Sequence, residues 1–170
     1  MRTLLLMMIT YSFVWAGGGV LEIVWPKQSQ TQQKSKANYP KVLKEGIKEV
    51  RLPVYLSSQY IYDKSMVVVA NEDFYSISFT LEGASVLFEG DRTYQEAVTP
   101  DNPEFQKIAQ KLKAVEYSKS EEMMIAQYSR HGANYTISVE CDNPQRDERC
   151  TQEKFIRKLY QSLVLVGGRP

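Results

Sequence analysis

Histidine and cysteine are scarce in this sequence, and neither sign of charge is in clear excess. Its 170 residues include one histidine and two cysteines, and 21 Lys and Arg residues face 20 Asp and Glu residues, for a net charge of +1. Most nucleophilic and zinc chemistry relies on histidine or on several cysteines. Nucleic-acid binders neutralise phosphates with an excess of basic side chains. The composition therefore predicts no nucleic-acid partner, no metal and no cofactor.

Short motifs that mark common catalytic sites are also missing. The sequence has no Gly-x-Ser-x-Gly elbow, no His-Glu-x-x-His helix, no Gly-x-x-x-x-Gly-Lys phosphate loop and no Gly-x-Gly-x-x-Gly fingerprint. The single histidine, His131, stands between Arg130 and Gly132, a setting typical of a solvated turn. We therefore predict no catalytic residue of the histidine-dependent kinds.

What the sequence does contain is enough apolar material for one packed domain. About 43% of the residues are apolar and 11% are aromatic, which lies outside the range of intrinsic disorder. The segment 17–38 includes Pro26–Ala37, a stretch without a large apolar residue, and is predicted to be a flexible linker. Residues 39–168 are predicted to form a single folded domain.

The first residues resemble an export signal. A basic start at Arg2 precedes the apolar run Leu4–Ile9, and Ala16 offers a cleavage point. This pattern predicts a signal peptide over residues 1–16. The alternative is an uncleaved membrane anchor over residues 4–21, because Leu4–Leu21 is 18 residues long and a bilayer core of about 30 Å needs roughly that length. Both interpretations place the domain outside the cytoplasm, and the second brings it into contact with a membrane.

The two cysteines are predicted to form a disulfide. Eight residues separate Cys141 from Cys150, a spacing that matches neither a Cys-x-x-Cys redox motif nor a zinc knuckle. An even number of cysteines in an exported chain indicates structural pairing.

Alternation of apolar and polar residues indicates several strands. The predicted strands are 52–56, 66–70, 75–81, 84–89, 123–129 and 134–141, with hairpin turns at Glu82-Gly83 and at Arg130–Ala133. Helical spacing of apolar residues predicts helices near 42–50, near 103–112, and from Thr151 through Val164, the last ended by Gly167-Gly168. The fold class that follows is α+β: an antiparallel sheet of five or six strands, packed by helices on one face and closed by a C-terminal helix.

Tyrosine is abundant for a chain of this length. The chain has 11 tyrosines, and several of them do not fit the apolar faces of the predicted elements. Exposed tyrosines suit recognition because they bury a large area with few rotatable bonds. We predict a contact segment at Tyr60, Tyr62, Asp63 and Lys64, in a polar loop between two strands.

These observations favour a small exported binding or accessory domain without catalytic activity. Its expected partner is an envelope protein, a lipid or a cell-wall component. One alternative is a secreted hydrolase that uses acidic residues, for which Glu89 and Asp91 at a strand end are the candidates. The other alternative is an accessory subunit held at the membrane by the uncleaved segment Leu4–Leu21.

Overall fold

A computed structural model describes residues 18–27, 36–95, 101–103, 106–107, 114–120 and 122–170. The predicted signal peptide lies outside the described residues. The same holds for almost all of the alternative anchor and for most of the helix predicted near 103–112.

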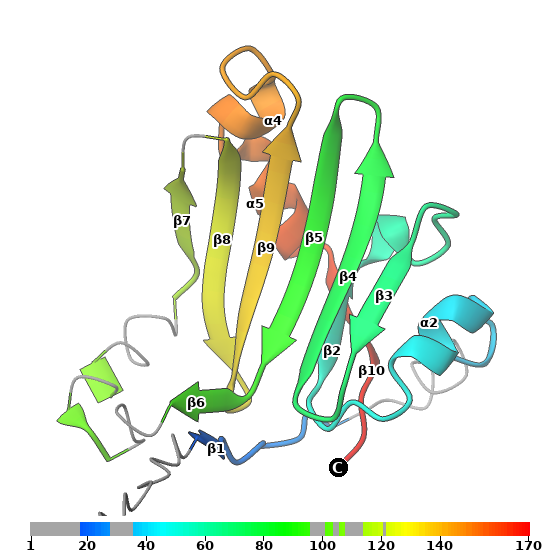
Figure 1. Cartoon of the computed structure of the whole chain (residues 1–170), viewed down its shortest axis with the longest axis vertical. Coiled ribbons are helices and arrows are strands. Elements are labelled where there is room, and N and C mark those ends of the chain that lie inside the picture. The colour runs from blue at the N-terminus through cyan, green and yellow to red at the C-terminus, as the bar shows by residue number, and fades with distance from the viewer. Residues whose placement is uncertain (1–17, 28–35, 96–100, 104–105, 108–113, 121) are drawn as a thin grey trace, which may run out of the picture.

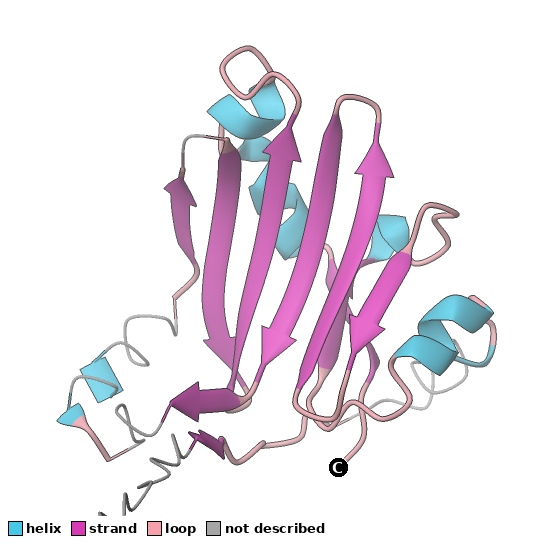
Figure 2. Cartoon of the chain, in the orientation of Figure 1, coloured by secondary structure: helices cyan, strands magenta, loops and turns pink. Residues whose placement is uncertain are grey.

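The centre of the fold is a six-stranded antiparallel sheet (Figures 1 and 2). Its strands follow the order β3-β4-β5-β9-β8-β7. The bounds are β3 Val67–Ala70, β4 Phe74–Leu81, β5 Ala84–Asp91, β9 Ala133–Cys141, β8 Met123–Arg130 and β7 Glu116–Lys119. Every neighbouring pair of these strands is antiparallel. The predicted α+β class and the size of the sheet are confirmed.

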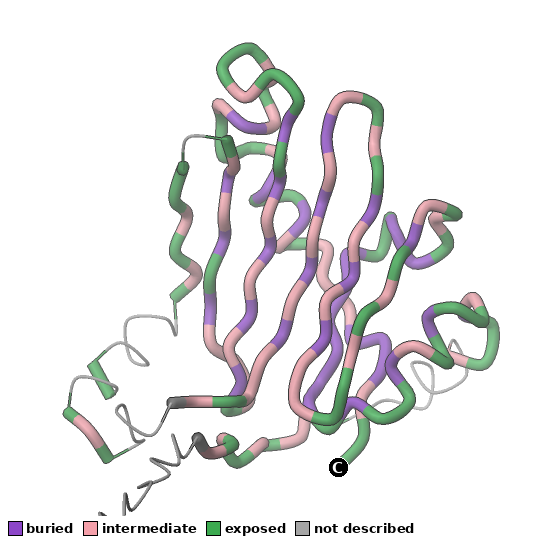
Figure 3. Tube along the Cα trace, viewed as in Figure 1, coloured by how far each residue is buried: buried purple, intermediate pink, exposed green. Residues whose placement is uncertain are grey.

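One face of the sheet is buried and the other is open. Along β5 and β9 buried residues alternate with half-buried ones, as the tube in Figure 3 shows. The inward side of β4 carries Tyr75, Ile77 and Phe79, each at most 1% exposed. A period of two is the consequence of the pleat, so the alternation in the sequence identifies the core side of these strands directly.

Both predicted hairpin turns are present. Gly83 has a φ of +71° between β4 and β5, and Asp142 donates its backbone N–H to the Gly83 carbonyl at 3.0 Å. Between β8 and β9, His131 and Gly132 have φ values of +58° and +85°. Two successive residues with positive φ are typical of the tight turn whose twist matches a hairpin.

A second layer covers the buried face. It consists of the helices α4 (Glu148–Thr151) and α5 (Lys154–Gln161) and of a two-stranded sheet in which β10 (Leu163–Gly167) pairs with β2 (Val54–Ser57). In Figure 1 these elements lie behind the large sheet. The short helices α2 (Lys41–Gly46) and η1 (Ser58–Tyr60) complete the layer beside β3 and β2.

Buried tyrosine hydroxyls join the two layers. The Tyr135 hydroxyl donates to the Pro53 carbonyl at 2.9 Å. The Tyr75 hydroxyl accepts from the Tyr55 backbone N–H at 3.1 Å and donates to the Tyr55 carbonyl at 3.2 Å. Strand β2 is short and pairs with one other strand. These hydrogen bonds therefore satisfy backbone groups that would otherwise be buried without a hydrogen-bond partner.

The predicted C-terminal helix is wrong in its last part. We expected Leu163 and Val164 on the apolar face of a helix, but α5 ends at Gln161 and Leu163–Gly167 forms β10. A continuous run of aliphatic and β-branched residues also fits a buried strand, and pairing with β2 buries Leu165 and Val166. The predicted strand 52–56 correspondingly pairs with β10 rather than with the large sheet.

The first described residues run along the end of the large sheet where β5 finishes and β9 begins. Strand β1 (Gly18–Val20) pairs with β6 (Thr93–Gln95). Farther along, Leu21 donates its backbone N–H to the Arg92 carbonyl at 2.6 Å, and Val24 donates to the His131 carbonyl at 2.9 Å. Residues 18–27 of the predicted linker thus contact the domain, while residues 28–35 lie outside the described residues.

The predicted disulfide is present. Cys141 at the end of β9 is bonded to Cys150 in α4, with a Cα–Cα distance of 6.3 Å. Asp147 caps α4 by accepting the Arg149 backbone N–H at 2.9 Å. The disulfide therefore holds α4, the first helix after β9, against the end of that strand, and α5 follows α4 directly.

Removing this disulfide is expected to destabilise the domain. Cys141→Ala/Cys150→Ala should lower the free energy of unfolding by about 2–3 kcal/mol, because closure of a loop of this length removes that much entropy from the unfolded chain. Urea unfolding of both proteins measures the difference. A reducing agent should shift the midpoint of the wild type and leave the double variant unchanged; an unchanged wild-type midpoint would contradict the expectation.

Candidate functional site

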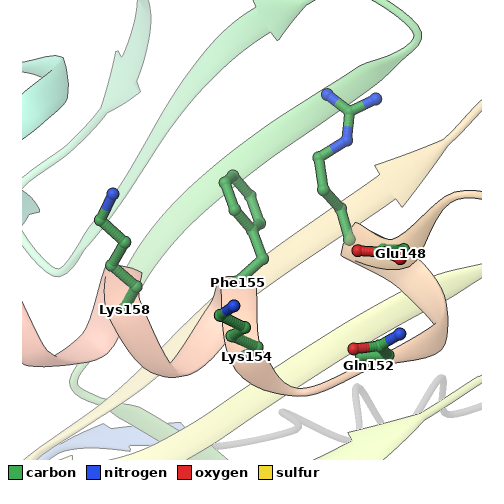
Figure 4. A pocket seen from close by; sticks show the side chains of 6 residues that line it. Glu148, Gln152, Lys154, Phe155 and Lys158 are labelled. Atoms are coloured by element: carbon green, nitrogen blue, oxygen red, sulfur yellow. The ribbon is translucent and has the colours of Figure 1, made fainter.

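The pocket with the clearest chemical character lies at the corner between α4 and α5. It has a volume of about 250 Å³. Figure 4 shows its lining side chains, with the Phe155 ring between the longer charged ones. The lining residues are Glu148, Arg149, Gln152, Lys154, Phe155 and Lys158. We call this site the Phe155 pocket.

The amphipathic pattern of α5 produces the pocket. Ile156 and Leu159 are fully buried against the sheet, and Phe155 precedes Ile156 at the border of the apolar stripe, where its ring is only half-buried. Lys154 and Lys158 are four residues apart and therefore neighbours on the same helix face. Both are exposed, and neither makes an ion pair with another described residue.

Arg149 differs from the two lysines because its charge is compensated. Its guanidinium binds the Asp147 carboxylate through Nε and Nη2, and Nη2 also donates to the Glu82 carbonyl at 3.0 Å. These side-chain hydrogen bonds from Arg149 hold the pKa of Asp147 below its usual value. The net positive charge of the Phe155 pocket therefore comes from Lys154 and Lys158, which form no ion pair with another described residue, and Glu148 in the lining offsets it in part.

The predicted tyrosine segment is divided between core and surface. Tyr60 is 9% exposed and stacks on Phe79 with ring centroids 5.0 Å apart. Burial raises the pKa of the Tyr60 hydroxyl and the charge of Asp63 raises it further, while the guanidinium of Arg149 opposes both. The first tyrosine of the predicted segment therefore belongs to the core.

The rest of the segment faces solvent. Tyr62 is 62% exposed and meets the Tyr39 ring edge-on at 6.3 Å. Asp63 accepts hydrogen bonds from the Ser65 hydroxyl at 2.7 Å and from the Ser65 backbone N–H at 2.8 Å, which lowers its pKa. Lys64 is exposed. The structure therefore does not bring Tyr60 together with Tyr62 on one surface.

Sequence reasoning missed a cluster of tyrosines around Arg130. The guanidinium carbon lies 5.1 Å from the Tyr55 ring centroid, 5.6 Å from that of Tyr128 and 6.0 Å from that of Tyr160. His131 stacks on Tyr55 at 6.2 Å, and burial together with the Arg130 charge lowers its pKa. The alternation along β8 places Tyr128 and Arg130 on the same side, but β2 and α5 contribute the other rings, which no local pattern shows.

The acidic candidates share a second pocket, on the open face of the sheet. Glu89 and Asp91 both line a cavity of about 270 Å³ at the end of β5. Burial raises the pKa of Glu89, a hydrogen bond from Ser76 opposes this shift, and the negative charge of Asp91 adds to it. Two residues of one strand face are about 7 Å apart along the strand.

Metal and membrane signals are lacking in the part of the chain that the structure describes. There, no three side chains among histidine, cysteine, aspartate and glutamate converge in a way that fits a metal ion. None of the helices in those ranges has both the length and the apolar character of a membrane span.

No protein-family model, curated protein or solved structure matches this chain. Its class is therefore defined by its own geometry: an α+β domain with a disulfide, whose described residues line several surface pockets. The disulfide is consistent with an oxidising compartment outside the cytoplasm.

Proposed function

We propose that this chain is an exported, non-catalytic binding domain that binds an anionic component of the cell envelope through the Phe155 pocket. The observation that carries the proposal is the combination of an accessible aromatic ring with two uncompensated lysines at one rigid corner of the fold. An apolar group of the ligand would contact Phe155, and its anionic group would lie near Lys154 and Lys158.

The surroundings of the pocket support binding with little rearrangement. The disulfide holds α4 against the end of β9, and the Asp147 cap fixes the first turn of α4. A preorganised site loses less entropy when a ligand binds. An export signal over residues 1–16 or an anchor over residues 4–21 would deliver the domain to the periplasm, the medium or the outer side of a membrane, where such ligands occur.

Neutralising the two lysines is expected to weaken binding to anionic vesicles. Lys154→Gln/Lys158→Gln should reduce affinity for phosphatidylglycerol-containing phosphatidylcholine vesicles by about 30-fold, since each lysine near an anionic lipid surface contributes about 1 kcal/mol. Vesicle sedimentation measures the loss of affinity at low and at physiological salt. The difference between wild type and variant should be smaller at the higher salt concentration, because salt screens the charges.

The matched control removes the same charge elsewhere. Lys41 on α2 and Lys119 on β7 are also exposed lysines, and Lys41→Gln/Lys119→Gln should retain most of the affinity. An equal loss in both double variants would show that binding follows net charge alone. Equal binding to vesicles of pure phosphatidylcholine would likewise count against an anionic ligand.

A secreted acid hydrolase is the second candidate, and the shared pocket of Glu89 and Asp91 favours it. A general acid benefits from a raised pKa, as at Glu89, with a second carboxylate beside it. Glu89 and Asp91 are two positions apart on one strand, so both carboxyl groups line the same pocket. The third alternative, a membrane-held accessory subunit, differs from the main proposal in that the N-terminal segment is not cleaved. The intact mass of the protein recovered from the membrane fraction distinguishes these two proposals.

A further inference from the structure

The pocket on the open face has a composition that the Phe155 pocket lacks. Phe74, Gly90 and Asn134 line it together with Glu89, Asp91 and Thr136. They come from three adjacent strands, β4, β5 and β9, at the end of the sheet where β5 finishes. In Figure 1 this face is turned to the viewer, and no helix of the described residues lies in front of it.

Strand register explains why these residues meet. Phe74 is paired with Asp91, and Asp91 with Asn134, so the three form one row across the sheet. The next row on the same face contains Ser76, Glu89 and Thr136. The Phe74 ring, half-buried, thus lies at one side of a block of hydrogen-bonding groups.

Local hydrogen bonds fix which atoms remain for a ligand. Asp91 Oδ1 accepts the Thr93 backbone N–H at 2.6 Å, which leaves Oδ2 as an acceptor. Asn134 Oδ1 accepts from the Ser129 hydroxyl at 2.6 Å, so that its amide nitrogen remains as a donor. The pocket therefore presents carboxylate acceptors, an amide donor, a threonine hydroxyl and an aromatic ring.

This set of groups selects among ligand classes. Two carboxylates without a lining basic residue repel an anion. A bare cation would use the carboxylates but not the Asn134 amide donor, whereas a saccharide hydroxyl can accept a hydrogen bond from it. A pyranose ring offers hydroxyls that donate and accept, together with an apolar face that packs on an aromatic ring.

We propose that this pocket binds one ring of an uncharged saccharide. Phe74 packs on the apolar face of the ring, Glu89 and Asp91 accept from its hydroxyls, and Asn134 donates to one of them. The site is independent of the Phe155 pocket because it lies on the opposite face of the sheet and has the opposite charge. A protein with both sites would hold a neutral sugar and an anionic group at separate places.

Saturation-transfer NMR with cellobiose and N,N′-diacetylchitobiose tests the proposal on the exported chain. We expect transfer to ring protons of at least one of the two sugars. Phe74→Ala should weaken that binding by about tenfold and Asn134→Ala by about fivefold. The matched controls are Leu87→Ala and Thr80→Ala, which truncate an apolar and a hydroxyl side chain elsewhere on the same face and should leave binding unchanged.

The outcomes separate this proposal from its competitors. Transfer to neither sugar, or transfer that persists in both Phe74→Ala and Asn134→Ala, would overturn it. Stronger binding of spermidine than of either sugar would also overturn it, in favour of a cation site. Thermal unfolding checks that Phe74→Ala is folded, and Asn134→Ala provides the test if it is not. Cleavage of a bound sugar, seen by mass spectrometry and lost in Glu89→Gln, would support saccharide binding and add hydrolysis to it.

Discussion

Raising the pH above about 10 is expected to unfold this domain steeply, since a free tyrosine has a pKa of about 10. Burial is the largest cause that raises the pKa of the Tyr75, Tyr128 and Tyr135 hydroxyls in the folded protein. Below the ordinary tyrosine pKa both states keep these protons, so that stability does not depend on them. Above it, the unfolded chain releases them while the folded chain retains them, and stability falls as the pH rises.

The size of the effect follows from the number of hydroxyls. Each retained proton contributes about 1.4 kcal/mol per pH unit, so three buried tyrosines give up to about 4 kcal/mol per pH unit. Circular dichroism and the ultraviolet absorbance of tyrosinate, recorded together, should change in one cooperative step. Tyr128→Phe removes one of these hydroxyls and should reduce the slope by up to about 1.4 kcal/mol per pH unit. Gradual ionisation of the tyrosines while the fold persists would contradict the expectation.

Replacing Tyr60 by alanine is expected to cost far more stability than replacing Tyr62. Tyr60 is packed against Phe79 and Phe88 in the core. Its truncation should lower the free energy of unfolding by about 3–5 kcal/mol, because lost apolar contact and a residual cavity both contribute. The mostly exposed Tyr62 should change it by less than about 0.5 kcal/mol.

Chemical denaturation of the two single variants measures this difference. Similar losses for both would mean that the loop packs differently from the structure described above. The same variants also test the predicted contact segment, because Tyr62→Ala can lower affinity for a partner without loss of stability. Tyr60→Ala cannot give such a clean result, since a destabilised core affects every property of the domain.

Alternation in the sequence was sufficient to find the central strands. In β4, β5 and β9 the buried positions alternate with the polar ones, apart from Phe74 and Leu87 on the open face, and the hairpin at Glu82-Gly83 connects the first two strands. The disulfide could be predicted as well, since only two cysteines are present. These features depend on neighbours within a few positions along the chain, which is the range that a pattern can report.

The features that the sequence concealed depend on contacts between distant segments. The run at Leu163–Val166 fits either a helix or a strand, and the presence of β2 decides it. The inward position of Tyr60 results from the short helix η1, whose sequence is polar and without a period. The pocket on the open face also requires knowledge of register, since Phe74, Asp91 and Asn134 belong to three strands that only the folded sheet aligns.

The pairing of β1 with β6 constrains the order in which an exported chain can fold. A chain that crosses a membrane N-terminus first delivers Gly18–Val20 long before its partner Thr93–Gln95. The early strand must therefore wait without a partner, while contacts that are closer in sequence form first. If a leader is removed after Ala16, the peptidase has the whole of that interval to reach its site before β1 docks. In that case cleavage would have to precede the docking of β1 on β6.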